Sequence, residues 1–317
     1  MSGNTWFHGG RRVLWAAALT FGFGAVATAG TVIIDSNTVY PNPGAGTPPV
    51  YGDFVTGSGA EFDQALTGAS GWGYTSVRQG ATVGINTTYA SDGDGSAYFN
   101  VTAGSGKADV GYLAAPGTSL GKLDDLNVLG YDWYRASGGT VNQHYAPVLR
   151  LVVTDGTTTR QVIYEPNNNK SDNGFSGVDA PTDDWKVIDA YNGGNGQFWV
   201  NKPNDAQIGT AISALKSVTD PADGTTTPYG DWDVVGFNVG VGSGWKNGGI
   251  DGTFIGAADN IRIGFIGGEV TTYNFEVPGA PNYAGGPGAV PEPASVAMGL
   301  MAGVAGLVVA ARRRRSA

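Results

Sequence analysis

The chain has 317 residues, of which 53 are glycine and none is cysteine, and its formal net charge at pH 7 is −9. The lack of cysteine excludes disulfides, thiolate-ligated metals and thiol catalysis. The acidic balance disfavours nucleic acid and anionic membrane surfaces as partners.

Residues 1–29 have the organisation of a secretory signal peptide. Arg11-Arg12 precede an apolar stretch at residues 13–26, and Ala27 and Ala29 supply the small residues of an A-x-A cleavage site. We expect cleavage before Gly30, with residues 25–27 as an alternative site. The protein is therefore predicted to be exported.

Residues 30–278 are predicted to form an all-β ectodomain. Many Asp-Gly, Asn-Gly and Gly-Gly pairs indicate turns between short strands. From Val235 to Val241, apolar residues alternate with Gly and Asn at the period of a β-strand. Similar runs occupy residues 97–102, 129–133, 149–153, 160–165, 185–189, 197–200, 261–265 and 271–275. About ten such strands predict an antiparallel β-sandwich.

One helix is predicted to interrupt the strands. Ile208, Ala211, Ile212 and Leu215 have the spacing of one helical face and follow a Pro-Asn-Asp start signal. We expect this helix to lie across one end or edge of the sandwich. Residues 279–290 are rich in Pro and Gly and are predicted to be a linker.

Residues 291–317 carry three features in order. Pro291, Glu292 and Pro293 precede an apolar run at residues 294–311, and a basic cluster of Arg312, Arg313, Arg314 and Arg315 follows it. Eighteen residues of helix span about 27 Å, close to the thickness of a bilayer. The positive-inside rule places the arginines in the cytoplasm. A buried helix of a soluble protein is the alternative, but this segment has no polar face.

These three features resemble the PEP-CTERM sorting signal of Gram-negative-type bacteria. The resemblance implies processing by an exosortase, transient anchoring of the C-terminal helix in the inner membrane, and delivery to the cell surface or extracellular matrix. The segment from Gly30 to Pro293 holds 12 of the 18 basic residues and all 27 acidic ones, so its net charge is −15.

The ectodomain resembles jelly-roll carbohydrate-binding modules in the order of its motifs. An early Glu61-Phe62-Asp63 is followed by Gly71-Trp72. An Asp-Gly-Ser turn follows Asp92, and Asp259-Asn260-Ile261 comes late in the chain. The resemblance implies a jelly-roll-like β-sandwich that contacts extracellular polysaccharide.

The same resemblance implies a structural calcium ion. Its candidate ligands are Glu61 or Asp63 together with Asp259, and Asp92 and Asp94 form a second acidic cluster. Calcium prefers six to eight oxygen ligands, which carboxylates and carbonyls supply. The alternatives are a solvated Asp-Gly turn at residues 92–95 and, for Asp259, bonding to nearby backbone.

Aromatic side chains are the candidates for stacking on sugar rings. Most are expected to fill the core, and Trp245, in a Gly-rich loop with few neighbours in sequence to bury it, is the strongest candidate for an exposed ring. Trp72 and Tyr74 are further candidates. The remaining aromatic residues considered for this role are Trp133, Tyr134, Trp185, Trp199 and Trp232.

Signals for catalysis are weak. Glu61 and Asp63 begin the E-x-D-x-x-E pattern of jelly-roll glucanases, but Leu66 replaces the third carboxylate. The G-x-S-x-G motif is absent from the sequence, and His144 is the one histidine of the ectodomain. The sequence therefore favours a structural or adhesive surface protein that binds glycans. A glycoside hydrolase or lyase with two unidentified carboxylates is the alternative.

Overall fold

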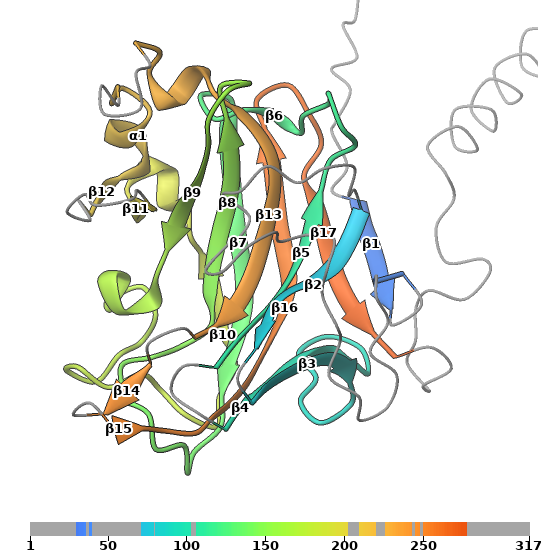
Figure 1. The fold of residues 1–317 in the computed structure, drawn as a ribbon, viewed down its shortest axis with the longest axis vertical. Coiled ribbons are helices and arrows are strands. Elements are labelled where there is room, and N and C mark those ends of the chain that lie inside the picture. Colours follow the sequence, from blue (N-terminus) through green and yellow to red (C-terminus); the bar gives the residue numbers. More distant parts are fainter. Residues whose placement is uncertain are drawn as a thin grey trace, which may run out of the picture.

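The computed structural model of the protein describes residues 30–35, 38–39, 71–78, 80–102, 106–201, 209–219, 226–242, 245–247 and 250–277. In these ranges the chain is mostly β-structure, arranged as two large sheets and one small hairpin (Figure 1). The hairpin pairs β14 (Lys246–Asn247) with β15 (Ile250–Asp251).

The first sheet has seven strands in the described residues. They are β1 (Gly30–Asp35), β3 (Ala81–Asn86), β4 (Ser96–Val101), β7 (Leu126–Arg135), β10 (Lys186–Asp189), β16 (Phe254–Phe265) and β17 (Thr271–Glu276). The main path runs β1-β17-β16-β4-β3, and β7 joins β16 to β10. All pairings are antiparallel except that of β1 with β17, which is parallel. The expectation of a purely antiparallel arrangement is wrong at this edge.

The second sheet has eight strands in the described residues. They are β2 (Gly71–Arg78), β5 (Lys107–Leu113), β6 (Gly121–Lys122), β8 (Val148–Thr154), β9 (Thr159–Tyr164), β11 (Gln197–Asn201), β12 (Thr210–Ala211) and β13 (Asp233–Val241). The path runs β12-β11-β9-β8-β13-β5-β2, with β6 paired to β13. Every run that we predicted from alternation overlaps a strand of one of the two sheets, so these predictions are confirmed.

The predicted helix is shorter than its periodicity suggests. Helix α1 covers only Ile212–Leu215, because Thr210 and Ala211 instead pair as β12 with the edge of β11. Ile212 and Leu215 are buried, as the pattern predicts. Helix α1 lies beside β11 and β12 at one edge of its sheet, while Ile208 is outside the described residues (Figure 1). In the described residues three short 3₁₀ helices cover Pro166–Asn169, Asn192–Gly194 and Tyr229–Asp231.

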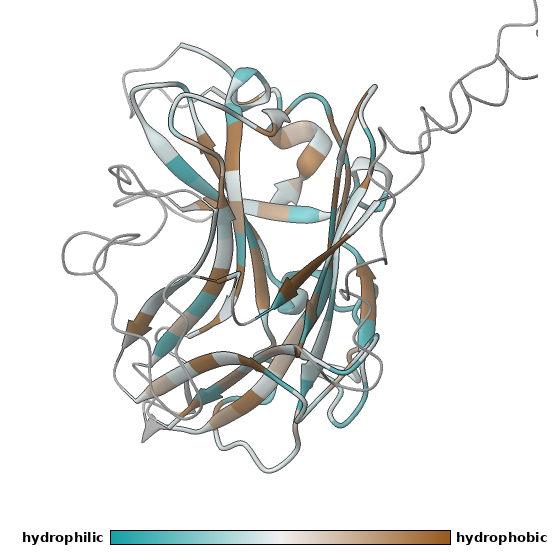
Figure 2. Ribbon diagram, turned by 90° about the vertical axis from the view of Figure 1, so that its right-hand side faces the viewer, coloured by the Kyte–Doolittle hydropathy of each residue, from teal (hydrophilic) through white to brown (hydrophobic). Residues whose placement is uncertain are grey.

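The two sheets share one hydrophobic core. Trp72 on β2 contacts Phe275 on β17 with ring centroids 5.3 Å apart, and Tyr131 on β7 contacts Tyr164 on β9 at 6.3 Å. Each pair joins one sheet to the other, so their inner faces pack together. Along the strands apolar and polar residues alternate, as the pleat requires (Figure 2).

Candidate functional site

Four partly exposed aromatic rings form a row on the seven-stranded sheet. We call Tyr98, Tyr89, Tyr134 and Trp185 the aromatic row. Tyr89 lies between its neighbours, with its ring centroid 6.2 Å from Tyr98 and 4.4 Å from Tyr134. Trp185 continues the row at 5.6 Å from Tyr134. All four side chains are intermediate in exposure, in contrast to the fully buried aromatic residues of the core.

The row lies on the face of this sheet that points away from the shared core. Tyr131 and Trp133 of β7 are fully buried, and Tyr131 contacts the opposite sheet. Successive side chains of a strand point to opposite faces, so Tyr134 points outward.

The sheet register explains why the rings meet. Ala257 of β16 is paired with Tyr98 on one side and with Tyr134 on the other. Its methyl group is small and fully buried, which leaves room for the ring of Tyr89 between the two tyrosines. On the far side of β7, Lys186 pairs with Trp133, so the preceding Trp185 reaches Tyr134. The row thus lies across four neighbouring strands, β4, β16, β7 and β10, over roughly 14 Å at the usual strand spacing.

The phenols of Tyr98 and Tyr134 stay protonated at neutral pH. Burial raises the pKa of Tyr98, and the neighbouring Tyr89 raises it further. Burial also raises the pKa of Tyr134, as does the carboxylate of Asp183. The Tyr134 hydroxyl donates a hydrogen bond to Asp183 Oδ1 at 3.2 Å. These groups can therefore donate and accept hydrogen bonds beside the apolar rings, which suits a hydroxyl-rich ligand.

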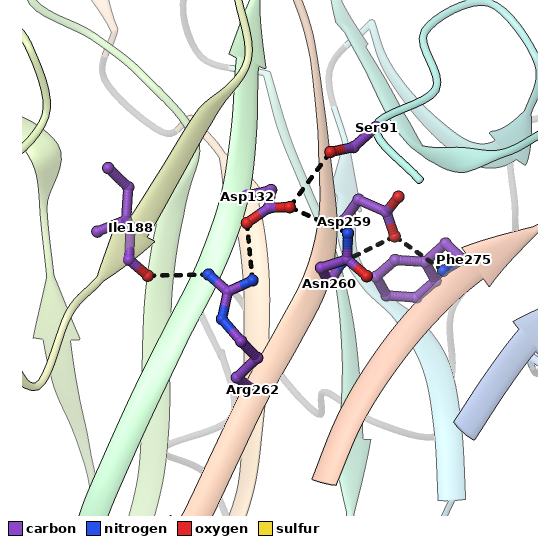
Figure 3. A network of polar contacts seen from close by, with 7 residues as sticks. All are labelled: Ser91, Asp132, Ile188, Asp259, Asn260, Arg262 and Phe275. Carbon is purple, nitrogen blue, oxygen red and sulfur yellow. Dashed lines mark hydrogen bonds and ion pairs between the residues drawn. The ribbon is translucent and has the colours of Figure 1, made fainter. Parts of the chain in front are cut away.

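A polar network beside the row centres on Asp132, two residues before Tyr134 on the same face (Figure 3). Asp132 Oδ1 accepts a hydrogen bond from Arg262 Nη1 at 2.8 Å. Its Oδ2 accepts from Asn260 Nδ2 at 3.0 Å and from Ser91 Oγ at 3.2 Å. Arg262 Nη2 donates to the carbonyl oxygen of Ile188 at 3.0 Å.

The network connects the segments that carry the row. Ser91 belongs to the same loop as Tyr89, and Ile188 lies in β10, which follows Trp185. Asp132 is nearly buried, and Arg262 is about a quarter exposed, at 25% of its side-chain area. Gly130 leaves space for this arginine, since a Cβ there would lie 3.1 Å from Arg262 Nε and 2.5 Å from the Ile188 carbonyl oxygen. We infer that Asp132 and Arg262 position the row.

A β-bulge brings Asn260 into this network. The register of β16 against β7 shifts between Asp259 and Arg262, and Asn260 has a φ of +48°. Asparagine tolerates this left-handed conformation better than most residues. The extra residue turns Asn260 toward Asp132, as its side-chain hydrogen bond shows (Figure 3).

The prediction that Trp245 is an exposed ring is wrong. Its side chain is 6% exposed and stacks on Tyr145, with centroids 4.8 Å apart and planes 5° from parallel. Phe254 packs edge-on against it at 4.9 Å. Residues distant in sequence bury the indole, so its sequence neighbours do not predict its exposure.

Trp72 and Tyr74 are also core residues. Trp72 is 6% exposed and contacts Tyr112, Phe237, Tyr273 and Phe275, and Tyr74 is fully buried. Neither ring has a free face for a sugar in this structure. The burial of both rings contradicts the expectation that they form an exposed glycan-binding surface.

The Asp92–Gly95 turn packs against the end of β17. The backbone N–H of Asp94 donates to Glu276 Oε2 at 2.7 Å. Gly93 has a φ of +78°, and a Cβ on it would lie 1.6 Å from Glu276 Oε1. Both the conformation and the close approach require glycine here. The turn is thus an ordered contact, with Asp92 exposed to solvent.

Asp259 is fully buried and bonds to nearby backbone. Its Oδ1 accepts hydrogen bonds from the N–H groups of Asn260 at 2.8 Å and Phe275 at 2.9 Å. Burial raises the pKa of this carboxyl well above its ordinary value, against the opposing effect of the main-chain hydrogen bonds. Asp259 therefore bonds to nearby backbone, as the alternative to calcium ligation predicts.

The described residues do not by themselves fit a calcium ion. No group of three or more His, Cys, Asp or Glu side chains in that part of the chain is arranged to hold a metal. Glu61 and Asp63 lie outside the described residues. The predicted ligand set with Asp259 stays a prediction.

A second polar cluster lies on the outer face of the eight-stranded sheet. Arg150 Nη1 donates to Asp109 Oδ1 and to Asn238 Oδ1, both at 2.9 Å, and Lys107 Nζ lies 3.3 Å from Asp109 Oδ2. These side chains are at most 5% exposed. A Cβ on Gly240 would lie 1.8 Å from Asp109 Oδ1, so this glycine makes room for the ion pairs. We regard the cluster as structural.

The predicted processing signals all lie outside the described residues. They comprise the cleavage site at Ala27 and Ala29, the motif Pro291, Glu292 and Pro293, and the basic cluster from Arg312 to Arg315. None of the helices in the described part of the chain has the length and apolar character needed to cross a bilayer.

The sequence identified part of the aromatic row. Tyr134 and Trp185 are among the aromatic residues that the sequence offers for stacking on sugar rings, and Tyr98 lies in a run predicted as a strand. Tyr89 is in the loop before β4, where no periodic pattern marks it. Its position depends on Ala257, which is far away in sequence.

Comparison with known proteins does not assign the chain to a group. No protein-family model matches it, and the search of curated proteins also gave no match.

Proposed function

We propose that this protein is an exported glycan-binding component of the cell surface or extracellular matrix. The aromatic row is the observation that carries the proposal. Partly exposed rings in a line, with phenol hydroxyls among them, provide the apolar surface and the polar groups that sugar rings require. The row covers four neighbouring strands, which suits an extended polysaccharide better than a single small molecule.

The arrangement of the sheets supports a jelly-roll-like β-sandwich as the scaffold. Two sheets pack through one core, and strands distant in sequence are neighbours, such as β16 with β4 and β13 with β5. Long connections between adjacent strands are typical of Greek-key folds. On such a scaffold the outer face of a sheet is a rigid platform for ligand contacts.

The two ends of the sequence support export and sorting. The signal peptide and the PEP-CTERM-like segment predict one route, in which an exosortase recognises Glu292 between two prolines at the membrane boundary. The prolines disfavour helix at this point and keep the site extended. Without these ends the protein is strongly acidic, which favours solubility outside the cell.

The sorting proposal is tested by Glu292→Ala. The variant should remain uncleaved in the inner membrane, as judged by fractionation and by its mass. Glu269→Ala is the matched control, because Glu269 is exposed in the turn before β17. Normal surface delivery of Glu292→Ala would show that the motif is not a sorting signal.

Glycan binding is tested with the processed protein and a panel of insoluble and soluble polysaccharides. Trp185→Ala should weaken binding by about 1–3 kcal/mol, the usual effect of removing an aromatic anchor. Tyr191→Ala is the control, since Tyr191 is a partly exposed ring at the other end of β10. Equal binding by both variants and the unsubstituted protein would show that the aromatic row is not the binding site. Absence of binding to every polysaccharide would contradict the proposed function itself.

A further inference from the structure

Asp183 is an exposed carboxylate in an uncommon backbone conformation. Its φ of +57° lies in the left-handed region, which is costly for residues other than glycine and is best tolerated by Asn and Asp. Because the side chain is exposed, packing of the carboxylate in the protein interior is not the cause of the left-handed φ. Strained residues of this kind often occur at functional sites.

Hydrogen bonds hold Asp183 in this position. Its backbone N–H donates to the Arg135 carbonyl oxygen at 2.8 Å. Its Oδ1 accepts from the Ser137 N–H at 2.9 Å and from the Tyr134 hydroxyl at 3.2 Å. The Ser137 hydrogen bond lowers the pKa of the carboxyl, so the group stays ionised. The Ser137 side chain also bonds to this carboxylate, and in the described part of the chain no cation is paired with Asp183.

One ring at this end of the row bonds to that carboxylate, and the second ring contacts the first. Tyr134 bonds to Asp183 directly, and Trp185 is two residues further along the chain. The ring planes are 45° apart with centroids 5.6 Å from each other. Inclined aromatic rings with a carboxylate provide a surface on which a cation is attracted both by the rings and by the charge.

In the described residues the carboxylate of Asp183 has no cationic partner, whereas those of Asp184 and Asp132 do. Asp184 pairs with Lys186 at 2.6 Å, and Asp132 pairs with Arg262 at 2.8 Å. The two cations next to the row are thus already matched with carboxylates. The segment from Gly30 to Pro293 as a whole carries a net charge of −15, so an acidic polymer would be repelled.

We propose that Asp183, Tyr134 and Trp185 form a site for a protonated amine, and that the glycan bound by the row carries amino sugars with free amino groups. This inference rests on the proposed function, because it names the class of glycan that the same row selects. The amine lies beside the Asp183 carboxylate, and the sugar ring rests on the aromatic row.

The test uses three oligosaccharides with the same linkage that differ at one position. These are β-1,4-linked oligomers of glucosamine, N-acetylglucosamine and glucose, which present an ammonium, an acetamide and a hydroxyl group. Affinities of the processed protein are measured by calorimetry at a pH where the amine is protonated. The glucosamine oligomer should bind roughly five- to thirty-fold more tightly than the other two. Added salt should weaken that preference.

Asp183→Asn removes the charge but preserves the left-handed conformation and an acceptor for Ser137. This variant should lose the preference for the amine. Asp184→Asn is the matched control and should retain the preference, because it removes an adjacent carboxylate that is already paired.

Three results would overturn the inference, and they differ in what they say of the proposed function. Equal affinity for all three oligomers, still lost in Trp185→Ala, would contradict the amine site and leave glycan binding by the row in place. An amine preference that persists in Asp183→Asn would also contradict the site. No binding by any of the three oligomers would overturn the amine site, and no binding to the wider polysaccharide panel would overturn the proposed function as well.

Discussion

Replacement of Asp132 by asparagine tests whether the polar network positions the aromatic row. Three side chains donate hydrogen bonds to this carboxylate: Arg262, Asn260 and Ser91. An amide offers one oxygen, so its NH₂ group must face at least one of these donors. The charge that Arg262 meets at 2.8 Å is also lost, although Arg262 is 25% exposed and solvent compensates part of this.

The expected cost follows from those contacts. Loss of a nearly buried charge-assisted hydrogen bond reduces the free energy of unfolding by about 2–3 kcal/mol. For a domain of this size the melting temperature should fall by about 4–12 °C. Polysaccharide binding should weaken as well, because the loop that carries Tyr89 and the strand after Trp185 lose their shared connection.

The assay is thermal unfolding of the processed protein together with binding to the same polysaccharide. Asp184→Asn is the control, since its exposed pair with Lys186 should contribute at most about 1 kcal/mol. If Asp132→Asn matches this control in both stability and binding, the reasoning that the network supports the row is refuted.

Three further substitutions test other parts of the structure. Asp109→Asn should lower the free energy of unfolding by about 3–5 kcal/mol, because it removes the buried carboxylate that Arg150 and Lys107 both contact; a change below about 1 kcal/mol in chemical denaturation would contradict a structural role. Asp259→Asn should gain stability relative to the unsubstituted protein as pH rises from acid to neutral. The folded-state pKa of Asp259 is raised, so the folded protein binds this proton more strongly than the unfolded chain does. The stability of the unsubstituted protein therefore falls as pH rises above the unfolded-state pKa, and that of the asparagine variant does not. Melting curves across pH measure this, and a variant weakest at neutral pH would indicate that the negative charge is needed. Trp245→Ala should cost about 3–5 kcal/mol of stability and leave glycan affinity unchanged, as expected of a core ring; lost affinity with unchanged stability would contradict its placement.

The strands could be predicted from the sequence because alternation reports the two faces of a sheet directly. Val235–Val241 lies within β13, and its apolar residues contribute to the core. The same reasoning found Ile212 and Leu215 as buried residues. It extended the helix too far, because pairing of β12 with β11 is a tertiary contact that overrides local periodicity.

The aromatic row is harder to predict from the sequence. Burial of an aromatic side chain depends on which strands become neighbours, and local composition does not contain this information. Trp245 stands among glycines yet stacks on Tyr145, a hundred positions earlier. Tyr89 fits between Tyr98 and Tyr134 because Ala257, on a strand near the other end of the chain, is small.

Oxidative footprinting of the processed protein tests the proposed glycan-binding surface most directly. Hydroxyl radicals label accessible aromatic rings, and mass spectrometry locates the labels. In the presence of a bound oligosaccharide, labelling of Tyr134 and Trp185 should fall, while that of Tyr191 should not change. If the oligosaccharide is bound and labelling of Tyr134 and Trp185 is unchanged, the glycan binds elsewhere and the aromatic row is not its site.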